Sequence, residues 1–283
     1  MGVTDCHVHI NPLWEMRPDA VRMLSQVEAS VARYLTEPKE FLAYLDRSGV
    51  ERAVLINYVA PEVIGYTEAA NTFVSEYART DPERLIAVGG IRPDHPDPER
   101  EVVHLVEDLG IRALKLHPPH QLFRPNAYVD GELPGLRALY DACSRHRLPV
   151  IFHTGTSIFP RARNRFADPL FLDDVAVDFP DLTIVLAHGG RPVWTETAVM
   201  LARRFANVWL EVSGMPPARL LEYFPQLPRI SEKVLFGSDW PGPGVRDIGA
   251  NLSTFRALPI PSEDQRRILE ENPLRVFPRR TPS

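Results

Sequence analysis

Eight short runs of hydrophobic residues recur along the chain, and each is too brief to form a helix of ordinary length. Their near-continuous valine, isoleucine and leucine content is typical of strands that are buried on both faces, as in a parallel sheet. The pattern therefore predicts eight strands. The runs occupy residues 3–10, 52–57, 85–91, 111–116, 149–153, 182–188, 207–214 and 233–239.

Most of the segments between these runs place hydrophobic residues at the spacing of a helix that buries one face. Several end in glycine or proline just before the next run, as helices that lead into a strand tend to do. These segments are predicted to be helices. They occupy residues 38–49, 67–83, 97–110, 133–147, 168–181 and 192–205.

Repeated strand and helix units with no break in composition favour one α/β domain over residues 1–283, folded as a (β/α)8 TIM barrel. A doubly wound open sheet is the alternative. A doubly wound fold typically has a glycine-rich, phosphate-binding turn after its first strand, whereas the sequence of this chain there is HINPLWEM. The chain is expected to close with a helix at about residues 261–277, followed by a loose tail.

Composition narrows the class of protein without identifying it. Hydrophobic residues make up 44% and charged residues 24% of the chain, which are ordinary globular values. The net charge of -5 argues against nucleic acid as a partner and favours a small-molecule substrate. Only Cys6 and Cys143 occur, and the chain shows no secretion signal and no membrane span. We therefore expect a soluble, cytoplasmic protein with no membrane partner.

The first strand carries the first candidate chemistry. In DCHVHI, residues 5–10, strand alternation places His7 and His9 on the same face, about 6 to 7 Å apart along the strand. One metal ion could hold both imidazoles. The spacing alone is a weak signal, because two histidines can fall this close together by chance.

Four more strands end in ligand-type or ionisable residues, and active sites of such barrels lie at the carboxyl ends of the strands. His153 closes one run, His188 closes the next, and Asp239 follows the last. Lys115 and His117 lie at the end of ALKLHP. Because scattered histidines would fall mostly in helices and loops, this agreement in position indicates a metal site at one rim of the barrel.

The ordered motifs DCHVHINP, ALKLHPPHQ, IFHTGT, LAHGGRP and LFGSDWPG resemble the amidohydrolase superfamily. Within it, the chain is similar to the amidohydrolase-related group, amidohydrolase 2, which includes aminocarboxymuconate semialdehyde decarboxylase and related aromatic-acid decarboxylases. The resemblance extends from residue 3 to about 277, and its motifs are specific as a set but weak one at a time.

The resemblance implies a distorted (β/α)8 barrel and a set of metal ligands. His7 and His9 after the first strand, His153 after the fifth and Asp239 after the eighth would bind the metal, and His188 would match the catalytic histidine of the family. Three imidazoles and one carboxylate suit one Zn²⁺ ion, although Mn²⁺, Fe²⁺ or Co²⁺ could occupy the same ligands.

The first functional hypothesis is hydrolysis of a lactone, an amide or a similar small carbonyl compound. A metal-bound water with a pKa of about 7 would be the nucleophile at neutral pH. Asp239 could bind the metal and take the proton of the water, while His188 polarises the substrate carbonyl.

The alternative is a non-oxidative, metal-dependent decarboxylase of an aromatic or unsaturated carboxylic acid, which would be a lyase. Arginines favour this hypothesis, because a guanidinium group binds a carboxylate in a bidentate fork. The candidates are Arg191, after the sixth strand, and Arg161, Arg163 and Arg165 in the loop after the fifth. The loop arginines could equally be surface residues.

Several other residues have more than one interpretation. In binuclear members of the superfamily, a lysine at the place of Lys115 is carboxylated and bridges two metals; a mononuclear site with Lys115 against a carboxylate is favoured here. His117 and Trp240 are assigned to substrate binding, with a structural turn and core packing as the respective alternatives. Asp5 and Glu211 could hold a ligand imidazole in place or serve only as satisfied buried groups.

Two further functions are weighed and disfavoured. A TatD-like metal nuclease also opens with two histidines, but it wants an additional glutamate ligand and a different final aspartate motif. A barrel that binds metal without catalysis usually loses ligands, and none is missing here. The substrate cannot be read from the loops. A homodimer is common in the resembling group.

Overall fold

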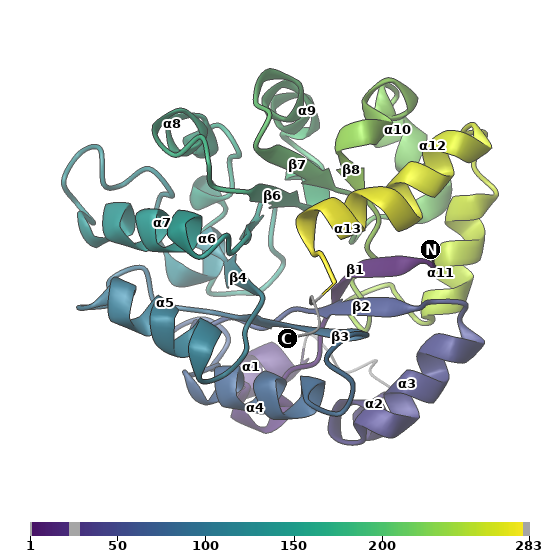
Figure 1. Cartoon of the computed structure of the whole chain (residues 1–283), viewed down its shortest axis with the longest axis horizontal. Helices are drawn as coiled ribbons and strands as arrows, with labels where there is room; N and C mark the ends of the chain where they lie inside the picture. The colour runs from purple at the N-terminus through teal and green to yellow at the C-terminus, as the bar shows by residue number, and fades with distance from the viewer. Residues whose placement is uncertain (1, 23–28, 280–283) are drawn as a thin grey trace.

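The core of the fold is a sheet of eight parallel strands in the order β1 to β8, surrounded by helices (Figure 1). A computed structural model describes residues 2–22 and 29–279. All eight predicted strands are present. Their bounds are β1 Thr4–Val8, β2 Arg52–Leu55, β3 Leu85–Gly89, β4 Ala113–Leu116, β5 Val150–His153, β6 Ile184–Ala187, β7 Val208–Glu211 and β8 Val234–Leu235.

Backbone hydrogen bonds join the first strand to the last and so close the sheet into a barrel. The amide of Cys6 donates to the carbonyl of Phe236 at 2.9 Å, and the amide of Asp239 donates to the carbonyl of His7 at 2.8 Å. The amide of His9 then donates to the carbonyl of Trp240 at 2.7 Å. This arrangement confirms the predicted TIM barrel in a single α/β domain.

Each predicted helix matches a helix in the structure, within a few residues at either end. The segment predicted at 261–277 is helical over 262–276, with a π-helical turn in the middle, and residues 280–283 of the expected tail lie outside the described residues. The α-helices are α1 Pro18–Val21, α2 Ala29–Thr36, α3 Pro38–Arg47, α4 Ala69–Ala78, α5 Pro98–Glu107, α6 Pro118–Gln121, α7 Gly135–Arg145, α8 Phe171–Asp178, α9 Thr195–Arg204, α10 Leu220–Tyr223, α11 Ile248–Arg256, α12 Ser262–Arg266 and α13 Asn272–Val276.

The prediction from the sequence does not include helices α1, α2, α6, α10 and α11, because they are short or lie inside segments that resemble loops.

Shorter turns complete the described elements. The 3-10 turns are η1 Leu13–Glu15, η3 Asn164–Phe166, η4 His188–Gly190, η5 Pro217–Arg219 and η6 Leu227–Lys233, and the π-helical turn is η7 Arg267–Glu271. None of the helices that the structure describes is long and apolar enough to cross a bilayer.

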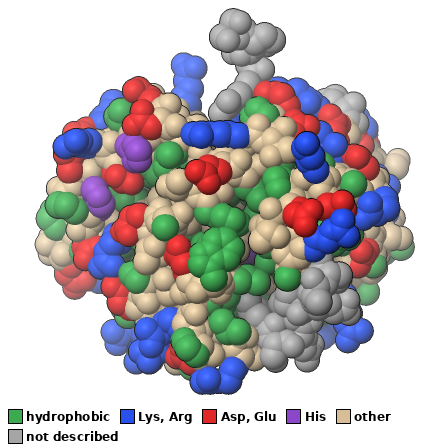
Figure 2. Space-filling view, turned by 90° about the horizontal axis from the view of Figure 1, so that it is seen from below, with side chains coloured by type: hydrophobic (Ala, Val, Ile, Leu, Met, Phe, Trp, Pro, Cys, Tyr) green, Lys and Arg blue, Asp and Glu red, His purple; other side chains and the backbone are tan. Residues whose placement is uncertain are grey.

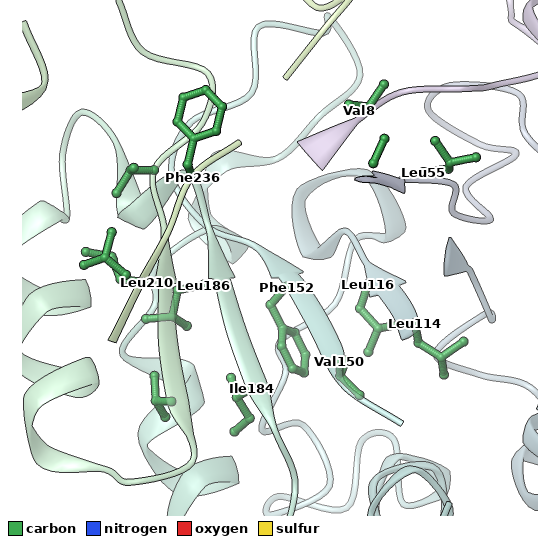
Figure 3. Close-up of a cluster of buried hydrophobic side chains, with 14 of the residues drawn as sticks. Val8, Leu55, Leu114, Leu116, Val150, Phe152, Ile184, Leu186, Leu210 and Phe236 are labelled. Carbon is green, nitrogen blue, oxygen red and sulfur yellow. The ribbon is translucent and has the colours of Figure 1, made fainter. Parts of the chain in front are cut away.

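Strand alternation sorts the side chains into two layers. The residues labelled in Figure 3, among them Leu114, Leu116, Val150 and Phe152, belong to one large buried cluster between the strands and the helices. Their neighbours along the chain point into the barrel. Lys115 and His153 are therefore directed inward, toward the space that the strands enclose.

The amino-terminal end of the barrel is closed by the end of the chain. Val276 and Phe277 lie in the same buried cluster as the inward-facing residues Val54, Ile86 and Val185. Helix α13 crosses the strands in Figure 1 and brings these residues into place. As a result, the polar interior described below opens at the opposite end, where the strands terminate.

Candidate active site

A cavity of about 370 Å³ lies at the carboxyl ends of the strands. Its floor is polar and its walls are largely apolar, as in pockets that bind small molecules. The polar lining includes His9, Lys115, His117, His120, His153, His188, Arg191 and Asp239. The apolar lining includes Leu13, Met16, Ile64, Tyr66, Phe159 and Met215.

His7, His9 and Asp239 come together at the point where the barrel closes. The Nε2 atoms of His7 and His9 lie 3.6 and 3.1 Å from Oδ1 of Asp239, and the two imidazole centroids are 5.1 Å apart. Nε2 of His7 is buried and has no hydrogen-bond partner among the residues that the structure describes. A buried nitrogen that faces a carboxylate and another imidazole is what a bound divalent cation would satisfy.

His7 is oriented by Glu211, from the end of β7. Nδ1 of His7 lies 2.8 Å from Oε2 of Glu211, and both side chains are almost fully buried. This pairing places the imidazole proton on Nδ1 and leaves the lone pair of Nε2 directed at the site. Of the two interpretations of Glu211 from the sequence, this contact matches the one in which it holds a candidate ligand imidazole in place.

Ser213 links Glu211 to His188. The Ser213 hydroxyl donates to Oε2 of Glu211 at 2.9 Å, and it lies 2.9 Å from Nδ1 of His188. The backbone amide of Ser213 also donates to Oε1 of Glu211 at 2.6 Å. Because the hydroxyl proton is directed at the carboxylate, its oxygen can accept from Nδ1–H of His188, which leaves Nε2 of His188 free for chemistry in the cavity.

His153 and His188 complete the group of imidazoles. Their ring centroids are 4.7 Å apart, as are those of His188 and His7, and Nε2 of His153 is buried without a partner. Among the residues that the structure describes, two sets of side chains have ligand atoms within 4.8 Å of one another: His7, His9 and Asp239, and His7, His188 and Glu211. His153 belongs to neither set, although its ring adjoins both through His188. The donors present fit a divalent cation with nitrogen and oxygen ligands.

Burial governs the protonation of these groups. It lowers the pKa of His7, His153 and His188 well below the ordinary value, so that the imidazoles are neutral and able to act as ligands. Burial acting alone would raise the pKa of Asp239. The hydrogen bond from His9 and the positive charge of Arg191 outweigh it, so that this pKa falls to about 2.

Lys115 projects from β4 into the barrel beside this group. Its side chain is fully buried, and its Nζ has no hydrogen-bond partner. Burial lowers the pKa of Lys115, while the negative charges of Glu211 and Asp239 act in the opposite direction. The position is the one expected from the sequence, at the end of a strand and on the lining of the cavity.

Arg191 extends its guanidinium group to the cavity from the turn after β6. Its Nη1 donates to the carbonyl of Thr156 at 3.2 Å, its Nη2 lies 3.8 Å from Oδ2 of Asp239, and its Nε is buried without a partner. Gly214 allows this approach, because a Cβ there would lie 2.5 Å from Nη2 of Arg191 and 2.7 Å from Oδ2 of Asp239. The side chain is held in place but retains donors for a ligand.

His117 lies on the cavity lining, as expected, whereas two other predicted substrate contacts lie elsewhere. Trp240 is buried against Phe41, with ring centroids 5.7 Å apart, and is absent from the cavity lining. Asp239 lies beyond β8 with a left-handed backbone, and Trp240 after it points away from the cavity, which matches the packing alternative. Arg161 forms an ion pair with Asp19 at 2.9 Å on the surface and is also absent from the lining.

Asp5 and Ser213 show what the sequence could and could not reveal. Asp5 lies below His7 on the inward face and accepts from the backbone amides of His7 and Ser238, at 3.1 and 2.9 Å. It therefore fixes the backbone of His7 rather than its imidazole.

The sequence does not single out Ser213. Its only signal was its place two residues after Glu211 at a strand end, the same spacing that relates His9 to His7.

We expect Ser213→Ala to lower kcat by about 10- to 100-fold, the effect typical of removing a group that orients a metal ligand. The alanine leaves Glu211 without one donor and leaves His188 free to rotate. Steady-state kinetics and metal affinity measured on the folded variant check this expectation. Ser213→Thr, which keeps the hydroxyl, is the matched control, and wild-type values for the alanine variant would contradict the assignment.

Comparison with known proteins gives a family and a set of similar folds. A model of the amidohydrolase family (Amidohydro_2) matches residues 4–279. No curated protein matches the sequence. Among solved structures, an uncharacterised TIM-barrel protein from Bordetella bronchiseptica is 24% identical with a TM-score of 0.75, and the match covers 98% of each chain.

Several of the similar solved structures carry a named activity, and two of them are decarboxylases from Sphingomonas and Polaromonas. One is 5-carboxyvanillate decarboxylase from Sphingomonas paucimobilis, at 17% identity and a TM-score of 0.70, with 99% of each chain covered. The other is a dihydroxybenzoic acid decarboxylase from Polaromonas sp. JS666 with bound manganese and the inhibitor 2-nitroresorcinol. It is 17% identical with a TM-score of 0.68, and the match covers 98% of this chain and 96% of that one.

Proposed function

Because the chain belongs to the amidohydrolase 2 family, we propose that it is a metal-dependent, non-oxidative decarboxylase of a small aromatic carboxylic acid. Hydrolysis, the first hypothesis drawn from the sequence, is supported less well. The observation that carries the proposal is the position of Arg191, whose buried Nε has no partner and whose guanidinium adjoins the candidate metal ligands.

Arg191 is suited to holding the carboxylate that is to be lost. A guanidinium group binds a carboxylate through two parallel hydrogen bonds, and this geometry fixes the orientation of the acid as well as its position. The contact of Nη2 with Asp239 is 3.8 Å, too long for a hydrogen bond, so the side chain is not fully engaged by the protein. A lactone or an amide would make less use of this group.

The walls of the cavity are suited to an aromatic ring. Met16, Ile64 and Tyr66 form part of a buried apolar cluster, and Phe159 packs against it. These four side chains line the cavity above the polar floor. A ring between them would present its carboxylate to Arg191 while its apolar faces leave water.

A divalent ion would be held by His7, His9 and Asp239, with His153 and His188 beside it. When bound, it would supply a Lewis acid that draws electron density from the substrate oxygens. The similar decarboxylase from Polaromonas contains manganese, and we propose Mn²⁺ or Zn²⁺ here. The distances and the unpartnered Nε2 of His7 support this ligand set.

The remaining requirement is a proton. Decarboxylation breaks the bond between the ring carbon and the carboxylate carbon, and that ring carbon must take up a proton as CO₂ leaves. Asp239 is ionised and His188 is neutral, so this proton comes from solvent. Both side chains lie beside Arg191 on the lining, where they can relay the proton to the ring carbon. The proposed roles are thus Arg191 for orientation and Asp239 with His188 for proton transfer.

Neither nucleic acid nor another macromolecule is needed for this function. On the face shown in Figure 2, lysine and arginine side chains are interspersed with aspartate and glutamate, and no continuous basic surface is seen there. The proposed partner is a small aromatic acid.

The test is a panel of hydroxybenzoates incubated with the metal-loaded protein, with CO₂ release as the measurement. Release from at least one acid, without uptake of water into the product, supports the proposal. Inactivity toward every acid, together with cleavage of a lactone or an amide, would replace it with hydrolysis.

Arg191→Lys separates the role of the two parallel hydrogen bonds of the guanidinium group from the role of its positive charge. Lysine keeps the positive charge but cannot form two parallel hydrogen bonds, so we expect kcat/KM for the best acid to fall by about 100-fold. Arg161→Lys, on the surface beside Asp19, is the matched control and should retain wild-type kinetics. If the two variants behaved alike, the assignment of Arg191 would be withdrawn.

A further inference from the structure

A second polar group lies on the cavity wall, apart from the candidate metal ligands. It consists of Tyr58, His120 and Ser157, all of which line the cavity. The hydroxyl of Tyr58 lies 3.1 Å from Nδ1 of His120, and Nε2 of His120 lies 2.8 Å from the hydroxyl of Ser157. The three side chains therefore form one continuous chain of hydrogen bonds.

These three side chains hold more protons than there are hydrogen bonds between them. A neutral imidazole carries one proton, and each hydroxyl carries one, so that three protons serve two hydrogen bonds. Burial lowers the pKa of His120 to about 3, so the imidazole is neutral at ordinary pH. Whether the hydrogen bonds run from Tyr58 to Ser157 or from Ser157 to Tyr58, the hydroxyl proton at one end has no acceptor among these three side chains.

Chemistry decides which end carries the free proton. A phenol is a more acidic donor than an alcohol and a weaker acceptor than an imidazole nitrogen, so Tyr58 donates to Nδ1 of His120. Nε2–H of His120 then donates to Ser157. The amide of Phe159 also lies within 3.3 Å of the same serine oxygen. Both lone pairs of the Ser157 oxygen then accept hydrogen bonds, and the Ser157 hydroxyl proton is the one without an acceptor in this group.

The side chain of Asn164 holds the backbone of Ser157 in this position. Oδ1 of Asn164 accepts from the amide of Ser157 at 2.8 Å, and Nδ2 of Asn164 donates to the carbonyl of Ser157 at 3.2 Å. The amide of Arg163 donates to the carbonyl of Pro119, which ties this loop to the helix that carries His120. A donor held in this way is preorganised for a ligand.

The surroundings make this donor selective. Ile158 and Phe159 flank it on the lining, and Met16 and Ile64 belong to the apolar wall. The imidazole of His120 is 6.3 Å from that of His153, with His117 stacked between them at 3.5 and 3.9 Å. A molecule that reaches both Ser157 and the candidate metal site must carry polar groups at two places.

We propose that the Ser157 hydroxyl, oriented by His120 and Tyr58, donates a hydrogen bond to a second oxygen substituent of the substrate and so selects acids that carry one. This inference rests on the proposed function, because it assigns recognition within the same cavity. Ser157 is a specificity-determining residue, and Tyr58 and His120 are positioning residues.

Equilibrium binding of unreactive analogues tests the inference on the metal-loaded full chain. The ligands are nitrobenzene, the three nitrophenols and 2-nitroresorcinol, in which a nitro group replaces the carboxylate and nothing can be released. For wild type, we expect at least one hydroxylated analogue to bind about tenfold more tightly than nitrobenzene, as one added hydrogen bond allows. Ser157→Ala should abolish that gain and leave nitrobenzene affinity unchanged.

Two further variants distinguish recognition from a structural effect. Ser157→Thr keeps the hydroxyl and should retain the gain. Tyr58→Phe should reduce it, because His120 can then accept a proton from Ser157 instead. An equal gain in wild type and Ser157→Ala, or failure of every analogue to bind, would overturn the inference.

The outcomes separate this inference from the proposed function. Hydroxybenzoate decarboxylation with a preference that Ser157→Ala leaves unchanged would overturn the recognition role alone. A gain that depends on Ser157, in a protein that decarboxylates none of the acids, would overturn the decarboxylase and leave the oxygen-binding site in place.

Discussion

Asp239→Asn is expected to lower turnover of the best substrate by about 10²- to 10⁴-fold, the range typical of a lost acid or base. The carboxylate faces Nε2 of both His7 and His9, and asparagine keeps its shape without its charge. The backbone of Asp239 has a φ of 69°, in the left-handed region that asparagine tolerates better than alanine. The fold should therefore survive the substitution.

Steady-state kinetics and a thermal unfolding scan together check this result. Asp94→Asn, at an exposed ion pair with Arg92, is the matched control and should retain full activity. Turnover within a few-fold of wild type in a folded Asp239→Asn variant would remove Asp239 from the chemistry.

Removal of the metal is expected to reduce activity to that of the uncatalysed reaction. Returning Mn²⁺ or Zn²⁺ should restore it. A readout independent of activity is thermal stability, since an ion at a thousand times its Kd stabilises the folded state by about 4 kcal/mol. His7→Ala should abolish this stabilisation. His104→Ala, at a surface pair with Asp108, should not.

Metal content and intact mass under CO₂ test the number of ions. We expect one metal per chain and an unmodified Lys115. Two metals with a carboxylated Lys115 would overturn the mononuclear proposal and place His188 among the ligands. If a chelator changed neither the thermal stability nor the activity of the protein, the result would contradict a metal site.

The elements of the barrel could be predicted because each depends on a local pattern. Runs such as PVIFH and LTIVLAH are short, apolar and end in a polar residue, and a parallel strand of this kind delivers that residue to the carboxyl rim. His153 and His188 were found in this way. The partner of each side chain was not, since Glu211 and His7 lie 204 positions apart.

The residues that sequence reasoning misplaced or missed lie where periodicity gives no information. Arg161 lies in a loop, and only the folded chain shows that Asp19 is its partner. Ser157 lies in the same loop, where serine is a common residue, and its contact with His120 joins this loop to helix α6. Trp240 lies beyond the end of β8 and follows Asp239, whose backbone is left-handed, so no strand period applies to its direction.

The closure of β1 against the segment after β8 has a consequence for synthesis of the chain. Asp5 and Ser238 are bonded although 233 positions separate them, and His7 and Asp239 meet at the same junction. The ribosome makes the histidines first and the aspartate much later, at about 5 to 20 residues per second. A nascent chain therefore holds only part of the ligand set, and the ion can be captured in full only after nearly the whole protein has emerged.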